Sequence, residues 1–217
     1  MIIISLKTES SVGQSGRGGQ YRIELSDGSL FSFKNCYLPP EIFNEYLNDP
    51  KDAEEREINA GEEAAFRFAS ACLRAEKAAL RLIARAEQCT NGLTRKLEQR
   101  GHSTVCVNTV ISRLAELKLL DDRRYAQLWL ESRLCLTRSP RRLLSALCGR
   151  GINRDDAQAA LKTALDEEAE FAMLTRFVKR HSRKKGGEGE NTARSFKYLL
   201  KSEGFSALAI ERFLDSC

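Results

Sequence analysis

Hydrophobic positions in the C-terminal two thirds of the chain recur with helical spacing, and one pattern is repeated three times. Two apolar residues stand four positions apart, a glycine follows four positions later, and then come an apolar or amphipathic residue and a polar one. The copies begin 50 and then 53 residues apart. They comprise Leu93, Leu97, Gly101, His102 and Ser103; Leu143, Leu147, Gly151, Ile152 and Asn153; and Phe196, Leu200, Gly204, Phe205 and Ser206.

Each position of this repeated pattern has a physical explanation. The apolar pair lies on one face of a helix. The glycine suits the left-handed position that ends a helix, and the Ser or Asn caps the helix that follows. The residue between them is placed to contact the fourth residue of that next helix, pairing His102 with Val107, Ile152 with Ala157 and Phe205 with Ile210. A fixed period of this length predicts a helical repeat protein.

The N-terminal segment instead shows the alternation of β-strands. Ile2 to Leu6 is apolar and β-branched, and alternating apolar residues surround Asp27-Gly28, which predicts a hairpin with a two-residue turn. Pro40 opens a short helix through Leu47. Three glycines at 13, 16 and 18 lack the Lys-Ser/Thr of a phosphate-binding loop, and we interpret Gln14 to Gly19 as an ordinary loop.

These patterns predict a mainly α protein with three tandem three-helix repeats, preceded by a small N-terminal β-hairpin module. The helices of neighbouring repeats meet at Leu119-Leu120-Asp121-Asp122 and at Leu165-Asp166-Glu167, where Asp121 and Asp166 are placed to cap the incoming helix. The predicted boundaries are a hairpin module with a short helix at 1–48, an acidic linker and helix start at 49–74, and repeats at 75–120, 121–165 and 166–217.

Charge is distributed unevenly along the 217 residues. Residues 1–70 hold 7 Lys and Arg against 12 Asp and Glu, a net charge of −5, whereas residues 71–217 hold 28 against 18, a net charge of +10. A basic helical body favours a polyanion, or a protein surface near one, as the partner. Ordinary solvated helix faces explain the same charges as well.

The seven cysteines indicate a reducing compartment. Their number is odd and no two form a C-x-x-C pair, so neither a disulfide framework nor a zinc site is indicated. Met1-Ile2-Ile3-Ile4 lacks the basic start of a signal peptide. No apolar stretch is long enough to span a membrane as a helix. We expect a cytoplasmic protein that does not enter a membrane.

No residue pattern predicts catalysis, a metal site or a cofactor. His102 occupies the position of Ile152 and Phe205 in the other copies, and His181 lies among basic residues without an acid or nucleophile nearby. The carboxylate pairs Asp121-Asp122 and Asp155-Asp156 each stand at a helix start, where capping explains them. Trp129 has the helical spacing of a core residue. We therefore expect a protein that is not an enzyme.

The remaining candidates for function are basic side chains that recur in successive repeats and could align on one surface. Such a surface suits phosphate contacts with salt-dependent affinity. The predicted partner-binding residues are Arg123, Arg124, Arg138, Arg141, Arg142 and Arg150, with Lys184 and Lys185 second.

The stretch Leu119-Leu120-Asp121-Asp122-Arg123-Arg124-Tyr125-Ala126 resembles the RecX family of regulators of the RecA recombinase. Three further sequence segments support the resemblance: Leu93 to Leu97 with Gly101, Ser139-Pro140-Arg141-Arg142-Leu143 with Gly151-Ile152, and Tyr198-Leu199-Leu200 with Gly204-Phe205. The likeness covers residues 60–217 well and the segment before them more loosely. Thr137-Arg138 departs from the glycine that relatives often carry before Ser139-Pro140.

The resemblance implies a curved, elongated, monomeric protein without cofactor that lies in the groove of a RecA–DNA filament. It implies that the protein limits filament growth, strand exchange and coprotease activity. DNA, bound directly or within the filament, is a further candidate partner. Two alternatives stay open: a free-standing basic DNA-binding protein, and a helical scaffold with an apolar face for peptides.

Overall fold

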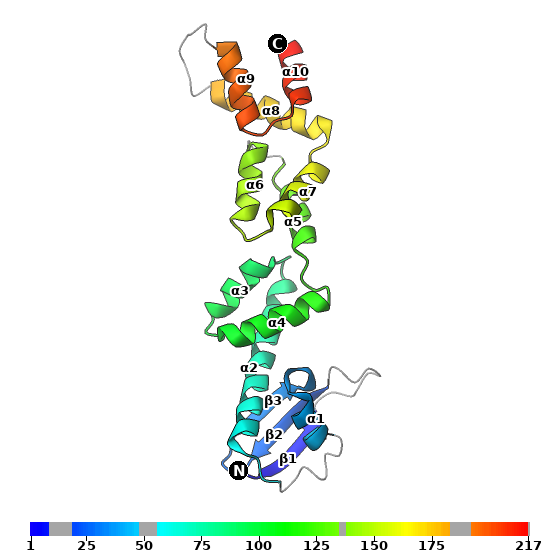
Figure 1. The fold of residues 1–217 in the computed structure, drawn as a ribbon, viewed down its shortest axis with the longest axis vertical. Helices are drawn as coiled ribbons and strands as arrows, with labels where there is room; N and C mark the ends of the chain where they lie inside the picture. The colour runs from blue at the N-terminus through cyan, green and yellow to red at the C-terminus, as the bar shows by residue number, and fades with distance from the viewer. Residues whose placement is uncertain (9–18, 48–55, 135–137, 183–191, 217) are drawn as a thin grey trace. The chain divides into compact units, whose positions relative to one another are not determined.

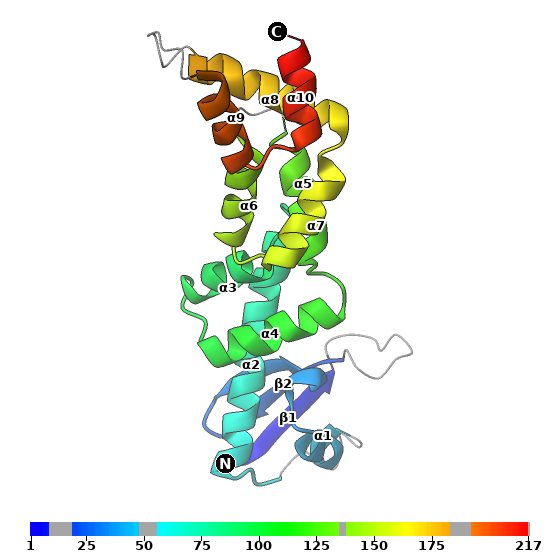
Figure 2. The same ribbon diagram turned by 45° about the horizontal axis from the view of Figure 1, so that its top comes forward.

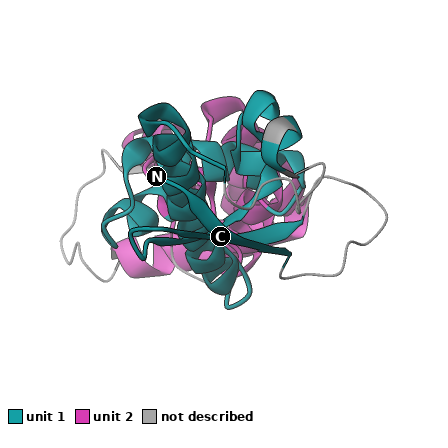
Figure 3. Ribbon diagram, turned by 90° about the horizontal axis from the view of Figure 1, so that it is seen from below, with its two compact units in different colours: residues 1–86, 93–119 teal, residues 87–92, 120–217 magenta. Residues whose placement is uncertain are grey.

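The computed structural model describes residues 1–8, 19–47, 56–134, 138–182 and 192–216. This described part is mainly helical, with ten α-helices and one three-stranded sheet, and the predicted fold class is confirmed. It divides into two compact units, residues 1–86 with 93–119 and residues 87–92 with 120–217 (Figure 3). Each unit has its own packing, and the first contains the sheet.

The N-terminal sheet of the first unit is an antiparallel meander of β1 (Ile3–Thr8), β2 (Gln20–Leu25) and β3 (Leu30–Lys34), in that order (Figure 1). Ile23 of β2 lies opposite Leu6 on one side and Phe31 on the other. Ile23 and Leu25 are fully buried, whereas Glu24 between them is exposed. The alternation of apolar and polar residues in the sequence therefore corresponds to a sheet with one face covered by the rest of the protein.

The hairpin between β2 and β3 differs from the predicted two-residue turn. The Leu25 N–H donates to the Ser29 carbonyl and the Gly28 N–H donates to the Leu25 carbonyl, so residues 26–28 form the loop. Gly28 has a φ of 83°. This is the left-handed conformation that closes three-residue hairpin loops. The Asp27 carboxylate accepts from the Ser29 N–H and so stabilises the longer loop.

Helices α1 (Pro40–Leu47) and α2 (Ala60–Ile83) follow, and a short 3-10 turn at Asn35–Tyr37 comes directly after the sheet. Asn59 and Glu62 form a reciprocal capping box at the start of α2. The helix packs along β3, where the Phe33 and Phe66 rings lie 5.3 Å apart. Because α2 is continuous, the domain boundary predicted between residues 74 and 75 falls inside a helix.

A buried carboxylate holds the elements of the first unit together. Glu76 of α2 is 2 % exposed, and its Oε1 accepts from Lys34 Nζ of β3 at 2.8 Å. The Arg113 guanidinium reaches Glu76 from α4 (Thr104–Glu116) with Nε 4.0 Å from Oε1. Arg113 also lies over the Tyr37 ring at 5.7 Å. A buried charge is tolerated here because two cations surround it.

Helix α3 (Thr90–Glu98) precedes α4, and the remaining helices belong to the second unit. In that unit α5 and α6 both pack on α7, and α8 packs on α10 (Figure 2). Their bounds are α5 Asp122–Glu131, α6 Pro140–Cys148, α7 Arg154–Ala164, α8 Glu167–Ser182, α9 Thr192–Ser202 and α10 Ala207–Asp215. Among the buried residues of its core are Trp129, Leu143, Leu147, Leu200 and Phe205.

The three repeated patterns form the predicted helix ends. Gly101, Gly151 and Gly204 have φ values of 83°, 85° and 89°. In each copy the residue after the glycine donates its N–H to the carbonyl five positions earlier, as in His102 to Leu97 at 3.3 Å. This pattern is a Schellman motif. The predicted caps are confirmed: Ser103, Asn153 and Ser206 begin the next helices, and Asp121 and Asp166 cap theirs.

Several sequence predictions concern residues outside the described part of the chain. They are the glycines at 13, 16 and 18, two of the seven cysteines, at 135 and 217, and the candidate contacts Lys184 and Lys185. In the part that is described, no helix has both the length and the apolar character needed to cross a membrane.

Candidate partner-binding surface

The two arginines that begin α5 are held by carboxylates of other elements. Arg123 follows the cap Asp121, and its Nε donates to Asp156 Oδ1 of α7 at 2.6 Å. This hydrogen bond, reinforced by the charge of Asp156, raises the pKa of Arg123. Although 76 % of the Arg123 side chain is exposed, its charge is already compensated within the repeat.

Arg124 makes a similar pair with a residue that precedes α3. Its Nε and Nη2 donate to Glu87 Oε1 at 2.8 and 2.6 Å. This hydrogen bonding raises the pKa of Arg124. The neighbouring Asp122 carboxylate accepts from the Thr90 N–H at 2.7 Å. The start of α5 is therefore hydrogen-bonded to Glu87 and Thr90 of the same unit.

Arg150 lies just after α6 and stacks on the tryptophan of the core. Its guanidinium carbon is 4.6 Å from the centre of the Trp129 ring, and that of Arg133 lies 5.3 Å from the same centre. Arg150 Nη1 also donates to the Ala146 carbonyl at 2.9 Å. Trp129 is 8 % exposed. It is therefore a core residue, as predicted, and Arg150 covers its face in a cation–π contact.

Residues at the start of α6 are bonded to Glu203, which directly follows α9. The Arg141 N–H donates to the Glu203 carbonyl at 3.0 Å, and the hydroxyl of Ser139 donates to the Glu203 carboxylate. Arg142 Nε lies 3.8 Å from the same carboxylate. These contacts hold the N-terminal end of α6, in the second repeat, against the turn after α9, in the third repeat.

Three of the predicted arginines have no carboxylate partner among the described residues: Arg150, which stacks on Trp129, and also Arg141 and Arg138. Arg141 is exposed, and its Nη1 donates to the neutral Ser202 carbonyl at 3.2 Å. Arg138 is half-buried just before α6. The structure thus divides the predicted arginines into four with an ion pair or a cation–π contact inside the unit and two, Arg138 and Arg141, with neither among the described residues.

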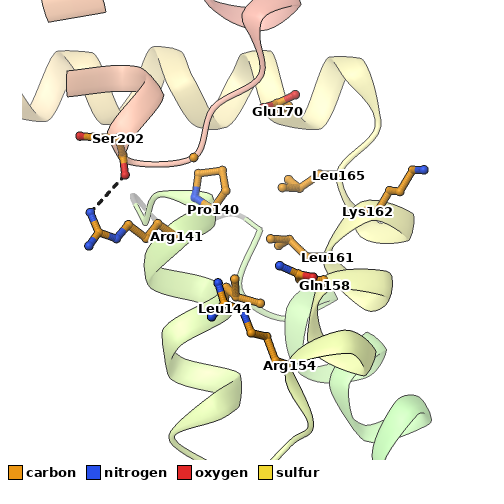
Figure 4. A pocket seen from close by; sticks show the side chains of 11 residues that line it. Pro140, Arg141, Leu144, Arg154, Gln158, Leu161, Lys162, Leu165, Glu170 and Ser202 are labelled. Carbon is orange, nitrogen blue, oxygen red and sulfur yellow. Dashed lines mark hydrogen bonds between the residues drawn. The ribbon is translucent and has the colours of Figure 1, made fainter. Parts of the chain in front are cut away.

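A groove beside Arg141 adds two cations that the sequence analysis did not single out. It has a volume of about 510 Å³ and lies between α6, α7 and the turn after α9 (Figure 4). Arg154 and Lys162 of α7 line it together with Arg141. The signal was present in the sequence: Arg154, Gln158 and Lys162 are spaced four apart, which places them on one helix face.

The charged side chains around this groove are mainly cationic. The described residues hold no group of three or more His, Cys, Asp or Glu side chains placed to bind a metal ion. The described lining of the groove presents three guanidinium or ammonium groups and one carboxylate, Glu170. Both Glu170 oxygens accept from Ser206, from its N–H at 2.7 Å and its hydroxyl at 2.8 Å. The groove is therefore a positively charged site for an anionic partner.

The amino-acid sequence that forms this surface is similar to that of known proteins. A family model described as the second three-helix domain of RecX matches residues 121–161, which include α5, α6 and most of α7. A Treponema pallidum protein named regulatory protein RecX is 33 % identical over 148 residues, covering 68 % of this chain and 87 % of the relative. A Thermobifida fusca protein of the same name is 31 % identical over 137 residues, covering 62 % and 73 %.

Solved structures share the fold at lower identity. A crystal structure of regulatory protein RecX has a TM-score of 0.70 and 18 % identity, and covers 99 % of this chain and 98 % of that one. The crystal structure of RecX from Lactobacillus salivarius has a TM-score of 0.53 and 20 % identity, covering 67 % and 96 %. These likenesses establish the helical architecture with its N-terminal sheet.

Proposed function

We propose, from the premise that this chain belongs to the RecX family of regulatory proteins, that it binds the filament of RecA on DNA and limits filament growth. RecX proteins are regulators and not enzymes. The observation that carries the proposal is the 33 % identity to a RecX protein over 87 % of that relative's length. The site of action would be the cytoplasm, where RecA filaments form.

The cations of the second unit that have no carboxylate partner in the described part of the chain support a role in contacting the filament. Arg123, Arg124, Arg142 and Arg150 make contacts inside the unit that stabilise the repeats. Among the predicted residues, we therefore propose Arg141 and Arg138 as the first contacts. Arg123 and Arg142 remain exposed enough to share a partner's anionic groups at the edges of their ion pairs. Lys184 and Lys185 stay predictions.

The test is the ATPase rate of the RecA protein of the same organism on single-stranded DNA. The protein is titrated below one molecule per RecA subunit, with and without excess free DNA. We expect inhibition at these ratios and little relief by free DNA, because the filament is the target. Inhibition that requires coating of the DNA would contradict the proposal and favour the free-standing DNA-binding protein.

A charge-changing variant locates the surface. Arg141→Glu combined with Arg142→Gln should weaken inhibition at least tenfold while the far-UV circular dichroism is unchanged. Arg81→Glu with Arg85→Gln, at the exposed end of α2 and just beyond it, makes the same change in net charge and is the control. If both double variants lose inhibition equally, net charge explains the effect and Arg141 is not a specific contact.

A further inference from the structure

The groove between α6, α7 and the turn after α9 has an apolar floor as well as a basic rim. Pro140 and Leu144 of α6 and Leu161 and Leu165, from α7 and its C-terminal cap, line it. In Figure 4 the side chains of Leu161 and Leu165 point into the space between the helices, and Arg141 and Lys162 lie at opposite edges. Leu144, Leu161 and Leu165 are each only half-buried, so water contacts this floor in the free protein.

The rim is unbalanced in charge. Arg154 and Lys162 are exposed and, among the described residues, neither has a carboxylate within ion-pair distance. Arg141 is bound only through the neutral Ser202 carbonyl. Glu170 is the single carboxylate among the described lining residues, and it is used by Ser206 at the start of α10. Three positive groups therefore surround a hydrophobic floor whose one carboxylate is already engaged.

The composition of the floor distinguishes between anionic partners. Single-stranded nucleic acid binds proteins through stacking of bases on aromatic side chains combined with phosphate contacts. The described lining of this groove contains leucines and a proline but no aromatic residue. Aliphatic side chains of a peptide pack well against such a floor, and its carboxylates suit the rim.

Hydrogen bonds inside the protein hold one wall of the groove in place. The backbone bond from Arg141 to Glu203 and the hydroxyl bond from Ser139 to Glu203 fix α6 against the turn after α9. Ser139 is completely buried, which keeps water from competing for this bond. A ligand would therefore bind without ordering the wall, which favours affinity.

From these observations we infer that the groove is a docking site for an acidic peptide segment of a partner protein that carries aliphatic anchors about one helical turn apart. The leucine floor receives the anchors, and Arg141, Arg154 and Lys162 bind the flanking carboxylates. The inference deepens the proposed function and rests on it only for the identity of the partner. It can fail while the RecA assay succeeds, because its test contains no recombinase.

The probe is a fluorescein-labelled peptide of about twelve residues in which two leucines four positions apart are flanked by glutamates, an arrangement chosen for helix-in-groove binding. Fluorescence anisotropy of this peptide is measured against the full-length protein. We expect saturable binding that weakens at least tenfold when both leucines are replaced by serine. Equal binding of the serine peptide would overturn the inference, because the floor would then contribute nothing.

Variants of the protein test the rim. Arg154→Glu with Lys162→Glu should weaken peptide binding at least tenfold, because both cations face the carboxylates. Lys179→Glu with Lys201→Glu makes the same change in net charge on exposed positions of the same unit outside the groove lining, and should change binding less than twofold. Equal losses in the two double variants would overturn the inference.

Two competing occupants are separate outcomes. The first is single-stranded DNA, tested with an oligo-dT strand of matched charge. If this strand displaces the peptide, and binds more weakly to the Arg154 and Lys162 variant but not to the control variant, the groove is a nucleic-acid surface. Dimerisation in analytical ultracentrifugation that the same variant abolishes would make it an interface between copies of this chain. Either result, or no binding of the peptide, overturns the inference.

Discussion

At the scale of single residues, one backbone conformation departs from the pattern of the three repeats. Helix α4 ends as the other repeated patterns do: the Leu119 N–H donates to the Leu114 carbonyl at 3.0 Å and the Lys118 N–H to the Ala115 carbonyl at 2.9 Å. The left-handed position, with φ of 56°, is occupied by Lys118 and not by glycine. A side chain there is strained by roughly 1–2 kcal/mol.

Lys118→Gly should therefore stabilise the protein. Relief of the left-handed strain outweighs the added entropy of glycine in the unfolded chain, for a net gain of roughly 0.5–1 kcal/mol. The measurement is the free energy of unfolding from urea titration. Glu116→Gly, at a helical position two residues earlier, is the control and should destabilise by about 1 kcal/mol. A loss of stability in Lys118→Gly would mean that the strain is smaller than assumed.

At the scale of elements, the three glycine helix ends share their hydrogen bonds but not their surroundings. A Cβ added to Gly101 would meet nothing within 4 Å. A Cβ on Gly151 would lie 2.6 Å from the Asn91 Cβ. The second glycine thus combines a left-handed turn with close packing, which makes it the most restricted of the three.

Gly151→Ala is accordingly expected to cost more stability than Gly101→Ala. The latter adds only backbone strain of about 1–2 kcal/mol, whereas the former adds the same strain and a clash. The free energies of unfolding are compared by urea titration. Asn91→Gly removes all three clashing atoms, Cβ, Cγ and Nδ2, and should recover part of the loss in the double variant, whereas Asn91→Ala retains the Cβ at 2.6 Å and should recover less. Equal losses at both glycines would show that Asn91 moves away freely.

At the scale of the whole molecule, each compact unit has its own hydrophobic core. Phe66 is fully buried in the first unit, with its ring 5.8 Å from that of Tyr46. The second unit contains the single tryptophan of the chain, Trp129. Tryptophan fluorescence therefore reports the second unit alone, whereas far-UV circular dichroism reports the helices of both.

Phe66→Ala should separate the unfolding of the two units. Truncation of a buried Phe costs about 3–5 kcal/mol, and domains with separate cores can unfold independently. We expect the circular dichroism transition in urea to broaden toward lower concentration while the Trp129 fluorescence midpoint moves little. Coincident shifts in both signals would mean that the units unfold as one cooperative structure.

The features that depend on neighbouring residues could be predicted from the order of amino acids alone. Caps such as Asp121 and helix ends such as Gly204 were predicted because their hydrogen bonds join residues close together in the chain. The mainly helical fold and its repeats followed from these local patterns, and the family was suggested by the resemblance of residues 119–126 and three further segments. The three-residue hairpin loop was missed because Asp-Gly occurs in turns of two lengths.

Which of the described cations have a carboxylate partner could not be predicted, because it depends on the packing of distant segments. The partners of Arg123 and Arg124 stand 33 and 37 residues away along the chain, and Arg142 meets Glu203 just beyond α9. Whether such groups meet depends on how helices pack, because sequence periodicity specifies a face but not its neighbour. The same packing brought Arg141 beside Arg154 and Lys162 and left their charges without a carboxylate partner in the described part of the chain, which no local pattern encodes.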